Sequence, residues 1–306
     1  MAPPLVSIVI PCYNQARYLG EAIESARNQH YSNVEAIVVD DGSTDDTAPV
    51  AAAYPGIRYL HQQNSGTAVA RNRGLSESLG EFVIFLDADD RLLPDAVARG
   101  VEYLGHHPHT AFVSGHVRLI DADGTPTVVQ APDHEPASYV ALLRWNYIWT
   151  PGAVMYRRTV LDAIGTFDPS AGGSADYDLN IRIARRLAVA CHHHPVLEYR
   201  LHDANMTRDS AHMLRSAVSV RRRQRKFAAG RDDARQAWRA GLKAAQADFG
   251  AQLVNRIKSD LIAARWRQAA RGLLCLLQYY PAGLAMMAAP REWPKLVTRR
   301  WRMTPR

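Results

Sequence analysis

The sequence of 306 residues predicts an α/β fold, in which a mostly parallel sheet is flanked by helices and a basic helical extension follows. Two observations predict the sheet: short apolar runs alternate with segments of helical periodicity, and several runs end in polar clusters. A third predicts the extension, because Lys and Arg dominate the last third of the chain.

The apolar runs define the predicted strands in order. They are residues 6–10, 34–39, 57–60, 82–86, 111–120, 154–156 and 196–201. Helical spacing predicts helices over 17–29, 67–79, 158–164, 179–187 and most of the chain beyond 211. We expect Ser43 or Thr44 to cap the helix that follows them, and Gly165 to end the helix 158–164.

Composition restricts the class of protein. A hydrophobic content of 47% supports a substantial core and one or two domains. The three cysteines (Cys12, Cys191 and Cys275) lie far apart, without disulfide or zinc spacing, which suits a reducing compartment. The N-terminus shows no basic region ahead of a long apolar run, so we expect no signal peptide and a cytoplasmic protein.

Three carboxylates follow the apolar run 82–86, namely Asp87, Asp89 and Asp90. Such a run is typical of a strand covered on both faces, and α/β folds bind ligands where parallel strands end. The Asp-x-Asp spacing lets two carboxylates converge on one hard cation. By itself the segment fits an acidic turn before the next helix equally well.

Similar polar clusters follow the first two strands, at 11–14 and 40–43. Because parallel strands end at one edge of a sheet, these clusters and the three carboxylates are predicted to line a single crevice. The glycine-containing loop 63–66 leads into a helix with Arg71, which suits a diphosphate. The first strand is followed by neither a Gly-x-Gly-x-x-Gly motif nor a P-loop, which argues against dinucleotide oxidoreductases and P-loop NTPases.

These motifs in this order resemble the family 2 glycosyltransferases of the GT-A fold, over residues 5 to about 205. The matching segments are 7–14, 39–45, 64–66, 70–74, 85–90, 165–168, 176–179 and 200–202. The resemblance implies an inverting transferase that uses a nucleotide-sugar donor and Mg²⁺ or Mn²⁺.

The resemblance also implies roles for individual residues. The nucleotide and its surroundings would be held by Pro11, Tyr13, Asn14, Asp41, Arg71 and Asp87, with Asp87 beside the ribose. Asp89 would bind the metal, and His202 would approach the metal or the diphosphate. A cation and an arginine suit a leaving diphosphate, whose developing negative charge needs neutralising.

The general base is implied by an acidic pair that usually reads Glu-Asp in this family. Here the pair reads Ala175-Asp176, so Asp176 is the predicted base and Asp178 its competitor. Two positions apart on a helix, these side chains point to different faces, so one of them serves. The alternative role of Asp176 is a cap for the helix beginning at residue 177.

Charge divides the chain. Residues 1–210 carry 16 Lys/Arg and 25 Asp/Glu, a net charge of −9, whereas residues 211–306 carry 21 and 5, a net charge of +16. The run 272–290 has no charged residue, and Trp293 and Trp301 follow it. This pattern favours an element at the inner face of a membrane. A re-entrant segment, a buried helix, a solvated basic face and nucleic-acid binding are the alternatives.

The sequence therefore predicts a catalytic domain over 1–210, with a nucleotide-sugar-binding half (1–100) and an acceptor half (101–210), and an extension over 211–306. The predicted activity is transfer of a sugar, most simply from a UDP-sugar, to a glycan or lipid-linked acceptor in polysaccharide or glycoconjugate synthesis. The rivals are an inactive sugar-nucleotide-binding protein of the same fold, a nucleotidyltransferase and a nucleic-acid-binding protein. We expect no nucleic-acid partner.

Overall fold

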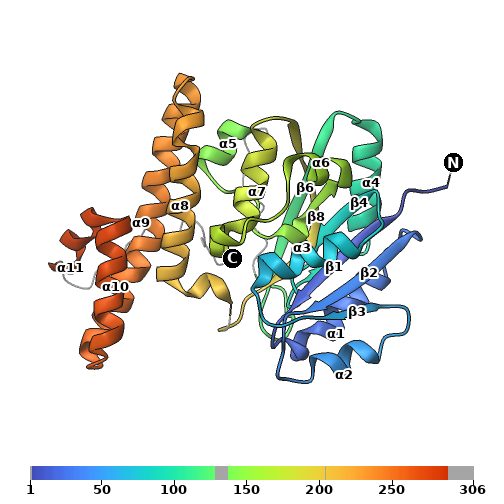
Figure 1. Ribbon diagram of the computed structural model, residues 1–306, viewed down its shortest axis with the longest axis horizontal. Coiled ribbons are helices and arrows are strands. Elements are labelled where there is room, and N and C mark those ends of the chain that lie inside the picture. The colour runs from blue at the N-terminus through green and yellow to red at the C-terminus, as the bar shows by residue number, and fades with distance from the viewer. Residues whose placement is uncertain (1, 128–136, 204, 289–306) are drawn as a thin grey trace. The chain divides into compact units, whose positions relative to one another are not determined.

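The computed structural model describes residues 2–127, 137–203 and 205–288, and these form two compact units. The sheet unit comprises Met1–Leu142, Asn146–Ser170 and Ala175–His202. The helical unit comprises Leu143–Trp145, Ala171–Ser174, Asp203 and the described residues 205–288. Figure 1 shows their elements along the chain.

The sheet unit contains one eight-stranded sheet in the order β3-β2-β1-β4-β7-β6-β8-β5. The strands are β1 (Val6–Cys12), β2 (Val34–Asp40), β3 (Arg58–His61), β4 (Phe82–Phe85), β5 (Arg91–Leu92), β6 (Thr110–Ile120), β7 (Val154–Arg157) and β8 (Ala188–Arg200). Pairing is parallel from β3 to β4 and between β6 and β8, whereas β7 is antiparallel to both neighbours and β5 to β8. The α/β fold class is confirmed, with a sheet that is parallel in its first half and mixed beyond.

The predicted helices are present, with shifted ends. The helices of the sheet unit are α1 (Ala16–Arg27), α2 (Thr47–Ala52), α3 (Thr67–Glu77), α4 (Ala96–His106), α5 (Tyr139–Arg144, whose last two residues belong to the helical unit), α6 (Arg158–Ile164) and α7 (Ala175–Ala184). No range was predicted for α2, α4 or α5. Gly165 ends α6 at φ 92°, as predicted. The predicted cap at Ser43 or Thr44 is wrong, because α2 starts at Thr47, whose backbone N–H is bound by the Asp45 carboxylate.

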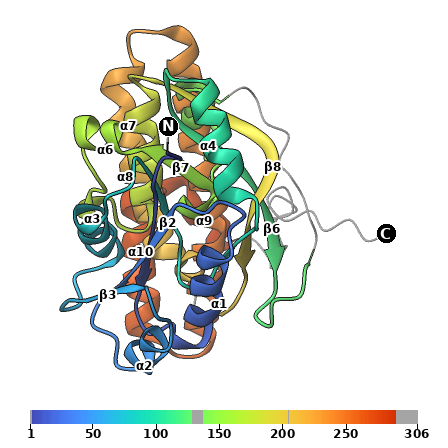
Figure 2. The same ribbon diagram turned by 90° about the vertical axis from the view of Figure 1, so that its right-hand side faces the viewer.

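Helices cover both faces of the parallel strands. Alternate side chains of β1, Val6, Ile8 and Ile10, pack with apolar residues of α1, α2 and α4. Val9 points the other way, toward Gly74 of α3. Figure 2 shows α1 and α4 on one side of the strands, with α3, α6 and α7 on the other. Strands covered in this way are the near-continuous apolar runs seen in the sequence.

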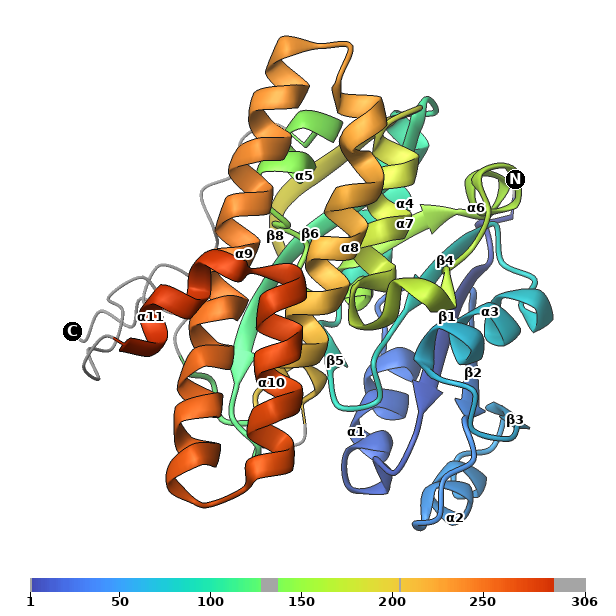
Figure 3. The ribbon, with the colours of Figure 1, turned by 60° about the vertical axis from the view of Figure 1, so that its left-hand side comes forward.

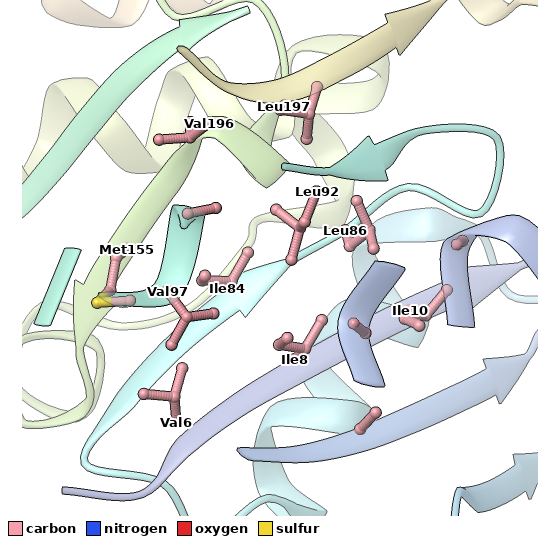
Figure 4. Packing of buried hydrophobic residues seen from close by; sticks show 14 of the residues in the cluster. Val6, Ile8, Ile10, Ile84, Leu86, Leu92, Val97, Met155, Val196 and Leu197 are labelled. Atoms are coloured by element: carbon pink, nitrogen blue, oxygen red, sulfur yellow. The ribbon is translucent and has the colours of Figure 1, made fainter. Parts of the chain in front are cut away.

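The core on the α1 side continues through the whole sheet unit. Figure 4 shows the β1 residues beside Ile84 of β4, with Val97 and Met155 next to them. Leu92 and Leu197 extend the same cluster to β5 and β8. This shared core holds the ends of β1 and β4 in a fixed relation, which matters for the side chains that follow them.

The helical unit is built mainly from α8 (Ser210–Ala228), α9 (Asp232–Ile262) and α10 (Trp266–Tyr279), which lie side by side in Figure 3. It has its own apolar cluster, to which α8 contributes Leu214, α9 Leu253 and α10 Leu276. The short turn Pro281–Leu284 and α11 (Ala285–Ala288) follow. In the described part of the chain, no helix is both long and apolar enough to cross a membrane.

The uncharged run 272–290 is therefore not one continuous helix. α10 ends at Tyr279, before Pro281. One side of α10 is buried through Ala269, Gly272, Cys275 and Leu276, and the other side is exposed. Residues 289–290, Trp293 and Trp301 lie outside the described residues.

Candidate active site

The predicted strand-end clusters meet at one edge of the sheet, because β1, β2 and β4 are adjacent and parallel. Cys12 pairs with Asp40 at the ends of β1 and β2, and Leu86 after β4 donates its N–H to Val9. Asp41 follows β2, and Asp87 to Asp90 follow β4. This is the edge at which open α/β sheets bind ligands.

Asp41 organises the loop ahead of α3. Its carboxylate is buried and accepts hydrogen bonds from Gln62 Nε2 at 2.7 Å, Ser65 N–H at 2.9 Å and Gly66 N–H at 2.8 Å. The glycine-containing loop is thereby tied to the end of β2. Neighbouring Asp40 accepts from Tyr59 and Ser43; burial opposes ionisation, but these hydrogen bonds prevail and lower its pKa.

Asn14 ties the first strand end to the second. Its side-chain oxygen accepts from the Thr44 N–H at 2.8 Å, and its own N–H donates to Ser43 Oγ at 2.9 Å. The residue has a positive φ of 52°, a conformation that Asn tolerates better than most residues. Beside it, Pro11 is buried and Tyr13 is 48% exposed, so Tyr13 offers an open aromatic face at this edge.

Arg71 and Asp87 form the central ion pair of the site. Arg71 Nη2 donates to Asp87 Oδ1 at 2.6 Å, and the guanidinium lies over the Phe167 ring. Arg71 is only 8% exposed, and burial alone would lower its pKa, but Asp87 and Asp176 raise it above the usual value. A buried cation between two acids remains charged and is held in place.

Thr150 joins two of the strand-end carboxylates. Its Oγ1 lies 3.3 Å from Asp87 Oδ2 and 3.3 Å from Asp90 Oδ2. Asp90 is 1% exposed and accepts the Arg200 N–H at 3.0 Å. Burial, followed by the charges of Asp89 and Asp87, raises the Asp90 pKa well above its usual value. Strand-end reasoning placed Asp90 at this edge without a role of its own, and it missed Thr150.

His202 meets the second acid of the Asp-x-Asp pair. Its Nε2 lies 2.8 Å from Asp89 Oδ2, and its ring packs against Tyr18. The adjacent Arg200 is fully buried and donates to the Asp89 carbonyl and to Glu21. The end of β8 is thus fastened to the turn after β4, which brings together residues 113 positions apart.

Asp176 lies in the first turn of α7, inside the helix rather than at its cap, so the predicted capping role is wrong. Burial raises its pKa, Arg71 opposes this, and Asp87 adds to it. Asp178 is buried and accepts a hydrogen bond from Arg182 Nε at 2.7 Å. The two acids therefore have different partners, and it is Asp176 that shares the electrostatic environment of Arg71 and Asp87.

The described fold and site can be compared with known proteins. A family model described as glycosyl transferase family 2 matches residues 7–165. The chain belongs to this family. An uncharacterized glycosyltransferase of Rickettsia typhi is 33% identical over 217 residues, covering 69% of this chain and 68% of the relative. The protein is therefore a glycosyltransferase.

Solved structures agree on the fold. Staphylococcus aureus TarS 1–349, determined with UDP-GlcNAc, superposes with a TM-score of 0.58 at 16% identity, covering 91% of this chain and 92% of that one. The mannosyltransferase PcManGT of Pyrobaculum calidifontis, determined with GDP-Man and Mn²⁺, also gives 0.58, at 19% identity and 95% and 89% coverage. At these identities the likeness shows the GT-A fold alone.

The family 2 site of this chain has donors that suit a divalent cation. Asp89 supplies a carboxylate oxygen and His202 a ring nitrogen, and Mn²⁺ and Mg²⁺ favour oxygen-rich sets completed by substrate phosphates. Among the described residues, no group of three or more His, Cys, Asp or Glu is placed to hold a metal. A carboxylate and an imidazole would leave further positions around such a cation open to diphosphate oxygens.

The structure brings most of the predicted site residues of this family 2 enzyme into two linked groups. Arg71, Asp87 and Asp176 form one, and Asp89 and His202 form the other, joined through the turn 87–90. Asn14 and Asp41 use side-chain oxygens to hold neighbouring loops. In the sequence, Thr150 stands out only as a hydroxyl residue directly before Pro151-Gly152, and this feature alone does not indicate a functional site.

Proposed function

We propose that this glycosyltransferase moves one sugar from a nucleoside diphosphate donor, most simply a UDP-sugar, to an acceptor hydroxyl with inversion at the anomeric carbon. The acceptor would be a growing glycan or a lipid-linked sugar in polysaccharide or glycoconjugate synthesis. The observation that carries the proposal is the ion pair of the buried Arg71 with Asp87, which Asp176 influences electrostatically, next to Asp89 and His202.

Donor binding follows from the edge of the sheet. Tyr13 and Pro11 would face the base, while Asn14 and Asp41 hold the surrounding loops. Asp87 would accept from the ribose, as its side chain is 27% exposed. Arg71 lies deep enough to act on the diphosphate with little loss of strength to solvent. The complexes of TarS with UDP-GlcNAc and of PcManGT with GDP-Man support a nucleotide-sugar donor by analogy of fold.

Asp89 and His202 would hold Mg²⁺ or Mn²⁺, which supplies Lewis-acid neutralisation of the diphosphate when bound. In the transfer itself, the acceptor oxygen forms a bond to the anomeric carbon as the bond to the donor phosphate breaks. The acceptor proton passes to the Asp176 carboxylate. A pKa raised by burial makes this carboxylate a stronger base than a solvated Asp.

The test is a panel of UDP- and GDP-sugars with Mn²⁺ or Mg²⁺, measured as nucleoside diphosphate release with water as acceptor. Asp176→Asn is expected to lower kcat by about 10²- to 10⁴-fold with little change in donor KM, the range for loss of a general base. Asp89→Ala is expected to lose metal-dependent turnover.

The matched control is Asp178→Asn, two positions along the same helix but paired with Arg182. It should retain turnover. Full activity of Asp176→Asn, or loss of activity confined to Asp178→Asn, would remove Asp176 from the role of base. A protein that binds the nucleotide but turns over no donor would be the inactive binding protein instead.

We further propose that the extension 211–306 brings the enzyme to a membrane surface, where a lipid-linked acceptor would lie, on the cytoplasmic face. Its net charge of +16 supports this.

A further inference from the structure

The outer side of α10 exposes large apolar residues. Leu274 is 66% exposed, Leu277 49% and Trp266 65%. Trp266 and Leu274 are eight residues apart, and Leu274 and Leu277 are three apart. These spacings keep the side chains on one side of a helix with 3.6 residues per turn. Single exposed leucines are common on proteins, but three large apolar groups on one side of a short helix form a patch.

The opposite side of α10 packs on the other helices of the helical unit. Gly272 lies against Ile257 and Leu253 of α9, where an added Cβ would come within 2.7 Å of Ile257. Cys275 donates to the Ala211 carbonyl of α8. Among the described residues, α10 thus packs on α8 and α9 through one side, while Trp266, Leu274 and Leu277 stay largely exposed.

The same surface is basic. Arg267 and Arg271 are exposed on α10, and neither α8 nor α10 contains Asp or Glu. Arg222 of α8 reaches α10, donating to the Gln278 carbonyl at 3.2 Å and lying over the Tyr279 ring. We define the α10 face as Trp266, Arg267, Arg271, Leu274 and Leu277, with Arg222 at its border.

We infer that the α10 face docks on a bilayer surface containing anionic phospholipids. This deepens the membrane association proposed above and names the element that carries it. Leucine and tryptophan gain free energy by entering the interfacial region, while arginines extend their charged groups to lipid phosphates. A nucleic acid fits this face less well, because leucine side chains gain little free energy beside a phosphate backbone. A second copy of the chain also fits less well, because two basic faces would repel each other.

The experiment is co-sedimentation of the full chain with vesicles of equal parts phosphatidylcholine and phosphatidylglycerol, compared with phosphatidylcholine alone. Binding is expected to the anionic vesicles and to weaken with salt. Arg267→Gln with Arg271→Gln should weaken it about twenty-five-fold, since each basic residue near such a surface contributes about fivefold. Leu274→Ser with Leu277→Ser should weaken it about tenfold or more.

Matched controls come from elsewhere on the chain. Leu79→Ser removes a leucine that is 75% exposed, and Arg235→Gln removes an exposed arginine of α9. Both should bind vesicles like the wild type. Trp266→Phe should abolish most of the quenching of tryptophan fluorescence by brominated lipid, which places the contact on α10.

Three results would overturn the inference: equal binding to both vesicle types, unchanged binding of the α10 variants, or loss in these variants of RNA binding or self-association instead of vesicle binding. Donor hydrolysis without vesicles is measured for every variant. Because that reaction needs no membrane, its retention with loss of vesicle binding separates this inference from the proposed function.

Discussion

Thr150 has one hydroxyl proton, yet its oxygen lies within 3.3 Å of both Asp87 and Asp90. With both acids ionised, one of these contacts would set lone pair against lone pair. A proton on Asp90, which its raised pKa favours, would remove this conflict: Asp90 would then donate to Thr150, and Thr150 to Asp87. Arg71 then completes the partners of Asp87, whose orientation is fixed from two sides.

Replacing Asp90 tests this arrangement through stability. A native pKa above the unfolded value of about 3.9 means that the native state holds the proton longer, so stability falls as pH rises through that window. Asp90→Asn reproduces the neutral acid without this dependence. Relative to wild type, its free energy of unfolding should improve by up to about 1.4 kcal/mol per pH unit above pH 4.

The measurement is urea unfolding of both proteins between pH 4 and pH 8. Asp90→Leu is the control, because it removes the acceptor of the Arg200 N–H and one partner of the Thr150 hydroxyl, and it should destabilise the fold by about 2 kcal/mol or more. An Asn variant that loses stability in parallel with the Leu variant would show that Asp90 is ionised in the native protein.

At the scale of elements, α3 positions Arg71 by lying close on the sheet. Gly74, one turn after Arg71, allows this approach: an added Cβ would lie 2.2 Å from Val9 Cγ1 and 3.1 Å from Val39 Cγ2. Because Gly74 has no side chain, α3 can pack directly on β1 and β2. The position of these strands therefore sets how deeply Arg71 is buried.

Gly74→Ala should destabilise the protein by about 1–3 kcal/mol, the usual cost of overpacking, and raise donor KM because α3 must move outward. Gly105→Ala is the matched control, being near the end of α4 with nothing within 4 Å of its added Cβ. It should be neutral or slightly stabilising, since Ala favours helix. Thermal unfolding and donor kinetics of the two variants decide the matter; equal effects would contradict close packing of α3.

At the scale of the whole molecule, each unit has its own apolar core. Ile8 belongs to that of the sheet unit and Leu276 to that of the helical unit, and both are fully buried. Units with separate cores can open separately.

Leu276→Ala should cost about 2–5 kcal/mol locally and speed hydrogen exchange in α8, α9 and α10. Exchange in β1, β2 and β4 should stay slow. The reciprocal variant Ile8→Ala should speed exchange in those strands. Mass-spectrometric hydrogen exchange on the full chain provides the measurement, and a uniform increase across both units from either variant would show a single cooperative unit.

The sequence by itself determined the parallel first half of the sheet, its flanking helices and the acids at its edge. These follow from local patterns: apolar runs, helical spacing, and polar residues where a strand stops. It also placed Asp176 just ahead of a helix predicted over 179–187, whereas that helix begins four residues earlier, at Ala175, and includes Asp176. Motif resemblance supplied the roles that patterns alone left open.

Only the tertiary structure decided which of these side chains meet. Asp89 and His202 are 113 residues apart, and the link from Thr150 to Asp87 spans 63, so no periodicity connects them. The short β5 was not predicted, and for β7 the strand was predicted over 154–156 but its antiparallel direction was not. Two- to four-residue strands acquire their hydrogen bonds from neighbours rather than from their own composition. Tertiary structure also decided which side of α10 is exposed. The uncharged run in the sequence indicated an apolar segment, but packing on α9 decided which of its residues remain in contact with water.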